Sequence, residues 1–96
     1  MPVPPVRPRS TAARLLREAS AEHGRTRTEL ATAARYRDPQ WPEPERAAVT
    51  SATLRLTERG LLRVTVATSG GAGEEVVYRL TPAGAEVKAQ LFKVAQ

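Results

Sequence analysis

The side chains in this sequence with the clearest chemistry are its arginines. The chain has 15 basic and 10 acidic residues, and all but two of the basic residues are arginine. Residues 1–37 carry eight arginines and three glutamates, whereas residues 38–96 carry seven basic and seven acidic residues. Guanidinium groups pair with phosphate oxygens in a bidentate manner, so this one-sided excess indicates a phosphate-rich partner. A solvated, arginine-rich surface is the alternative that charge alone leaves open.

Catalytic and metal chemistry have little support in the sequence. There is no cysteine, His23 is the only histidine, and the acidic residues are scattered. The glycine-rich residues 69–73 lack the Lys-Ser/Thr pair of a phosphate-binding loop. We therefore expect no catalytic residue, no metal and no cofactor, and no small-molecule substrate is evident. The chain is not expected to be an enzyme, and His23 is interpreted as a helix-capping or surface residue.

Length and composition indicate one domain of 96 residues. No apolar run approaches the roughly 20 residues of a membrane span, and residues 1–8 do not resemble a signal peptide. We therefore expect a cytoplasmic protein without a membrane partner. Four prolines among residues 1–9 predict a flexible Pro/Arg-rich N-terminal arm, followed by one folded domain over residues 10–96.

Two helices are predicted in the first half of that domain. The first helix is capped by Ser10 or Thr11 and ends at Gly24. Its buried face consists of apolar residues at helical spacing: Ala12, Leu15, Leu16 and Ala19. A capping box of Thr26 and Glu29 opens a second helix, which stops around Tyr36 or Arg37. The proline-punctuated connection DPQWPEP (residues 38–44) follows, and its Trp41 is expected to fold onto the core.

A third helix is predicted with Pro44 in its first turn and Gly60 at its end. Its inner stripe consists of Val49, Ala52 and Leu56. Ala47, Thr50, Ser51 and Leu54 lie opposite that stripe, flanked by Arg46 and Arg55.

Beyond Gly60 the apolar period changes from 3.6 to 2 residues. Two alternating runs, around residues 62–67 and 76–80, flank a glycine-rich loop and predict a β-hairpin. Thr81 and Pro82 then open a last helix with an apolar stripe of Val87, Leu91 and Val94. The predicted fold is α+β: a winged helix-turn-helix with a three-helix core, a β-hairpin wing and a C-terminal helix.

Three segments in this order resemble the winged-helix DNA-binding superfamily, in particular MarR-like and PadR-like transcriptional regulators. AVTSATLRLTERGLL (residues 48–62) is similar to their recognition helix and following strand. VYRLTPAG (77–84) is similar to their "Y-x-L-T-x-x-G" junction, and TELA (28–31) to their second helix. The resemblance spans residues 26–91.

This resemblance implies that the third helix enters the major groove of double-stranded DNA. The base-reading positions would be Arg46, Ala47, Thr50, Ser51, Leu54 and Arg55. The wing tip departs from the pattern, because it carries Glu74 and Glu75 and no basic residue, which makes the arm the better minor-groove element. Phosphate or minor-groove contacts are expected from Arg7, Arg9, Arg25, Arg27 and Arg63.

The implied function is sequence-specific DNA binding by a transcriptional regulator. A winged-helix protein–protein adaptor is the alternative, as is a DNA-binding protein of plasmid or phage replication or partition. A homodimer is also expected, because two-fold operators suit dimers and the last helix has more apolar residues than one face needs. The dimer contacts would be Val87, Leu91, Phe92 and Val94.

Overall fold

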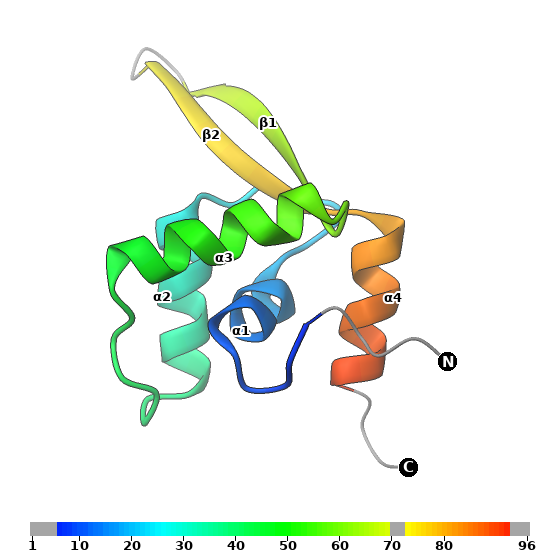
Figure 1. The fold of residues 1–96 in the computed structure, drawn as a ribbon. Coiled ribbons are helices and arrows are strands. Elements are labelled where there is room, and N and C mark those ends of the chain that lie inside the picture. The colour runs from blue at the N-terminus through cyan, green and yellow to red at the C-terminus, as the bar shows by residue number, and fades with distance from the viewer. Residues whose placement is uncertain (1–5, 70–72, 93–96) are drawn as a thin grey trace.

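The computed structural model describes residues 6–69 and 73–92. Three helices come first, then an antiparallel hairpin and a final helix (Figure 1). The elements are α1 (Thr11–Glu18), α2 (Arg27–Arg37), α3 (Arg46–Glu58), β1 (Leu62–Ser69), β2 (Gly73–Leu80) and α4 (Pro82–Leu91). This is the predicted α+β order of elements, with α3 lying across α1 and α2.

Helix α1 begins where the sequence predicts but ends earlier. The Ser10 side chain accepts a hydrogen bond from the Ala13 amide and caps the helix. The helix ends at Glu18 because Ala19 is extended, so the prediction that Gly24 ends it is wrong. Gly24 serves a different purpose: a Cβ there would lie 2.7 Å from the Val77 Cγ2 atom, so glycine lets the α1–α2 connection pack closely against the Val77 side chain.

Helix α2 begins and ends where the sequence predicts, and the predicted ends of α3 are confirmed in part. Thr26 and Glu29 form the capping box, and α2 ends at Arg37. Helix α3 starts at Arg46 after an extended Glu45, so Pro44 precedes the helix and does not occupy its first turn. Gly60 follows the last turn with a φ of 73°, the left-handed conformation that favours glycine after a helix.

The core lies among the inner faces of the helices and the base of the hairpin. Leu15, Leu16, Leu30, Leu56 and Leu62 are its largest fully buried apolar side chains. Val6 also belongs to this core and is only 4% exposed, although it falls within the predicted N-terminal arm. Val6 is therefore packed against the helices, whereas residues 7–9 that follow it are exposed.

The hairpin projects away from the helices (Figure 1), and the residues at its base, Leu62, Val77 and Tyr78, are buried. Leu62 pairs with Leu80, and Val66 pairs with Val76, so the predicted two-residue period is confirmed. Val64, Val66 and Val76 are nevertheless 44–60% exposed, because the helices cover only the base. On β2, Tyr78 exchanges two backbone hydrogen bonds with Arg25 (2.8 and 3.1 Å), which ties the α1–α2 connection to the hairpin.

Helix α4 opens on the predicted Thr81 cap and Pro82. The Thr81 hydroxyl accepts from the Gly84 amide and donates to the Gly60 carbonyl oxygen (2.6 Å). A Cβ at Gly84 would lie 2.0 Å from the Leu61 carbonyl oxygen. The glycine thus allows α4 to pack directly against the turn that joins α3 to β1.

Candidate nucleic-acid interface

Helix α3 is held in place by a buried hydroxyl as well as by apolar packing. Thr53 is fully buried, and its Oγ1 lies 3.0 Å from the Val49 carbonyl oxygen and accepts from Arg27 Nε at 3.0 Å. The sequence analysis missed this residue, although Val49, Ala52, Thr53 and Leu56 follow the i, i+3, i+4, i+7 pattern. The side chain of α2 that reaches Thr53 fixes α3 relative to the preceding helix.

The outward face of α3 carries the residues predicted to read bases. Arg46, Ala47, Ser51, Leu54 and Arg55 are exposed, and Thr50 is half-buried. Glu58 is also exposed on this helix, four residues after Leu54. The sequence analysis did not include Glu58, which helical spacing alone would have placed on this face.

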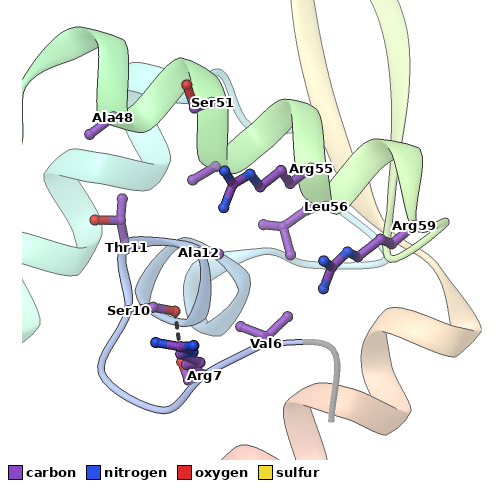
Figure 2. Close-up of a pocket in the computed structure, with 11 residues that line it drawn as sticks. Val6, Arg7, Ser10, Thr11, Ala12, Ala48, Ser51, Arg55, Leu56 and Arg59 are labelled. Carbon is purple, nitrogen blue, oxygen red and sulfur yellow. Dashed lines mark hydrogen bonds between the residues drawn. The ribbon is translucent and has the colours of Figure 1, made fainter. Parts of the chain in front are cut away.

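Two hollows flank that face. One, of about 600 Å³, lies between α3 and the segment that leads into α1, and it is lined by Ser51 and Arg55 of α3 and by the C-cap residue Arg59 (Figure 2). The other, of about 550 Å³, lies between α3 and α2, and Arg46 and Thr50 line it from α3. The predicted base-reading set is therefore divided between the two sides of one helix.

The residues predicted to hold phosphates are spread over several elements. Arg7 and Arg9 are exposed before α1, and Arg63 is exposed on β1. Arg27 lines the hollow beside α2, with its guanidinium 5.6 Å from the centre of the Tyr78 ring. Arg25 lines a third hollow with Glu18, Glu29 and Arg37, and its buried Nε has no hydrogen-bond partner in the described part of the chain. The structure therefore does not bring Arg25 together with Arg7.

The segment before α1 is a folded turn from Val6 onward. The Arg7 carbonyl oxygen accepts from the Ser10 amide (3.2 Å) and the Ser10 hydroxyl (2.6 Å). Arg9 has a φ of 67°, which a non-glycine residue adopts only when its surroundings enforce it. Its carbonyl oxygen accepts from Arg14 Nε at 3.4 Å. These contacts hold Arg7 at the start of α1, where it lines the hollow whose other wall is α3.

The proline-rich connection between α2 and α3 is tied to α1. Arg14 forms an ion pair with Asp38, and the same guanidinium lies 4.9 Å from the centre of the Trp41 ring. The hydrogen bond from Arg14 lowers the pKa of the Asp38 carboxyl group. Trp41 is half-buried against α1 through this stacking and is not a member of the buried core.

The residues predicted to form a dimer contact pack, in part, within the chain itself. Val87, Leu91 and Phe92 are half-buried against the core, and the Arg17 guanidinium lies 4.8 Å from the centre of the Phe92 ring. Val94 lies outside the described residues. Each of the three described side chains keeps some exposed surface, so the dimer contact stays a prediction.

Neither a metal centre nor a membrane span is found in the described part of the chain. Residues 6–69 and 73–92 hold no group of three or more His, Cys, Asp or Glu side chains that could share a metal ion. No helix among them is long and apolar enough to cross a bilayer.

Comparison with known proteins gives a match in structure only. No protein-family model matches the sequence, and no curated protein matches it. Among solved structures, the chain is similar to Bacillus subtilis PadR in complex with operator DNA, with a TM-score of 0.66 at 15% identity. The match covers 90% of this chain and 48% of that one, so the chain spans about half the length of the structure it resembles. The order of helices and hairpin and the similarity to this structure together show that the chain has the winged-helix fold that its sequence predicted.

Proposed function

We propose that this chain binds double-stranded DNA in a sequence-specific manner through α3 and acts as a transcriptional regulator. The observation that carries the proposal is the exposed face of α3 with an arginine on each side. Arg46 and Arg55 are nine residues apart, two and a half helical turns, so they lie on opposite flanks of the helix. A helix in the major groove has a phosphate backbone on each side, and guanidinium groups suit both.

Between these arginines the helix presents groups that could read base edges. Ser51 is exposed and Thr50 half-exposed, and a hydroxyl can donate to or accept from a base. The solved structure that the chain resembles contains operator DNA, which is a property of that protein and supports the same use of the fold here. We further propose a homodimer through α4, which would match a two-fold operator.

A protein–protein adaptor is the second candidate, and Leu54 is the observation in its favour. Leu54 is 57% exposed near the middle of the outward face, with the exposed Glu58 one turn further on. A leucine can contact a thymine methyl group, but a carboxylate on that face repels phosphate. An apolar side chain beside an acid would equally suit a protein surface.

Salt-dependent binding to duplex DNA separates the two candidates. A preferred sequence would first be selected from a random duplex library, and binding to it would then be followed by fluorescence anisotropy at several salt concentrations. A DNA-binding protein gives a slope of log affinity against log salt of about −0.9 for each phosphate contacted. Arg46→Gln and Arg55→Gln should each reduce that slope by about one unit. A chain that selects no sequence and does not bind duplex at low salt would favour the adaptor.

A further inference from the structure

The hollow between α3 and the segment before α1 has an unusual set of charges. Its lining comes from the segment that leads into α1 and from α3 with its C-cap Arg59, and Figure 2 shows Arg55 on the side of α3 that faces the segment holding Val6 and Arg7. The lining residues are Val6, Arg7, Ser10, Thr11, Ala12, Ala48, Ser51, Ala52, Arg55, Leu56 and Arg59. Three of them are arginines and none is acidic.

The guanidinium groups of Arg7 and Arg55 have no ion-pair partner within residues 6–69 and 73–92. Other arginines of the described residues do form ion pairs with carboxylates. These pairs are Arg14 with Asp38, Arg35 with Glu43 and Arg37 with Glu18. Arg7 and Arg55 both line this hollow, and an anion bound in it would reduce the repulsion between their like charges.

The hollow is better suited than an open surface to bind a small group, because of its volume and its apolar floor. Its volume of about 600 Å³ falls within the range of small-ligand sites, roughly 300–1,000 Å³. Val6 and Leu56 are buried beneath it, and an apolar floor strengthens charge-assisted hydrogen bonds by excluding water. The first turn of α1 also lines the hollow, and the positive end of a helix dipole favours an anion.

We propose that this hollow is a binding site for a phosphate group, held by Arg7 from the folded turn and by Arg55 from α3. The phosphate could belong to the DNA backbone or to a phosphorylated small molecule, because the chemistry of recognition is the same. Arg55 lies on the helix proposed to read DNA, so a small phosphorylated ligand would compete with DNA only where a backbone phosphate occupies this same site. The link to DNA rests on the proposed function, whereas binding of the phosphate group does not.

The first test uses the intact chain and inorganic pyrophosphate, followed by isothermal titration calorimetry at low salt. We expect saturable binding that Arg7→Gln and Arg55→Gln each weaken by about tenfold. The control Arg35→Gln removes the same charge from outside this hollow and should leave pyrophosphate affinity unchanged. Arg7 and Arg55 are both exposed, so their substitution should not disturb the fold. Thermal melts of each variant check this. Absent or non-saturable binding, or equal loss in the control, would overturn the proposal.

The second test distinguishes the source of the phosphate and uses duplex DNA at constant ionic strength. If pyrophosphate competes with duplex, and if Arg55→Gln has a smaller slope of log affinity against log salt, then the hollow binds a phosphate of the DNA backbone. Pyrophosphate binding that leaves duplex affinity unchanged supports a site for a small phosphorylated molecule. If the chain binds pyrophosphate but no duplex, the proposed function fails and this site stands. If it binds duplex but no pyrophosphate, the site fails and the function stands.

Discussion

The two faces of α3 differ in almost every physical property. The inner face consists of Val49, Ala52, Thr53 and Leu56, all buried, and it contacts α1 and α2. The outer face carries alanine, serine, leucine and arginine side chains that are exposed. The same thirteen residues therefore contribute to stability on one side and are available for recognition on the other. Substitutions on the two faces should consequently give effects that do not overlap.

The largest effect is expected from truncating the inner face. Leu56→Ala removes a side chain that is 1% exposed and should lower the free energy of unfolding by about 2–5 kcal/mol, because it leaves a cavity between α3 and α1. Urea denaturation followed by circular dichroism measures this loss. A loss below about 1 kcal/mol would mean that the contact between α3 and α1 is not as tight as the structure shows.

A smaller loss is expected at the buried hydroxyl of the same face. Thr53→Val keeps the shape of the side chain but leaves Arg27 Nε without its 3.0 Å acceptor, which should cost about 1–3 kcal/mol. Thr57→Val is the matched control, since Thr57 is half-buried and, among the described residues, its hydroxyl bonds only to the Thr53 carbonyl oxygen of its own helix. Equal urea midpoints for the two variants would contradict a structural role for the Thr53–Arg27 contact.

On the outer face the expected loss is in DNA discrimination rather than in stability. Thr50→Ala and Ser51→Ala should each reduce the preference for a selected duplex over a random one by about 1–3 kcal/mol. Their unfolding free energies should stay within about 0.5 kcal/mol of the wild type. The measurement is the ratio of affinities for the two duplexes at one salt concentration. Wild-type ratios in both variants would show that this face is not the reader.

The smallest effect on stability is expected at Leu54. Because its side chain is 57% exposed, Leu54→Ser should change the unfolding free energy by less than about 0.5 kcal/mol. This makes the variant a clean probe of recognition. A loss of duplex discrimination would assign Leu54 to a thymine methyl contact, whereas unchanged DNA binding would leave it available to a protein partner.

Local signals in the sequence predicted most of the fold, and contacts between distant residues account for the errors. The capping box at Thr26, the cap at Thr81 and the stripe of α3 each depend on residues a few positions apart, and the structure confirms them. Gly24 was misjudged because its partner, Val77, is more than fifty residues away.

The composition of the site was predictable only in part, for the same reason. Periodicity separates the outer face of α3 from its inner face, but it does not show that Arg7 and Arg55 line one hollow. That proximity depends on the burial of Val6, a lone apolar residue among prolines and arginines. Thr53 escaped notice because a polar residue type gave no sign of complete burial, although its position in the helix did.

The projecting hairpin has a further consequence for how the protein behaves at high concentration. In the described part of the chain, one edge of β1 pairs with β2 and its other edge pairs with nothing. From Val64 to Ser69 that strand reads VTVATS, a β-prone run without a charge. Such an edge is a template for strand addition by another molecule, and native proteins protect it with charges or proline. Arg63, at the start of the strand, is the charge nearest this run within β1. Thr65→Lys or Val66→Lys should therefore reduce any self-association through this edge, which light scattering at increasing protein concentration would measure.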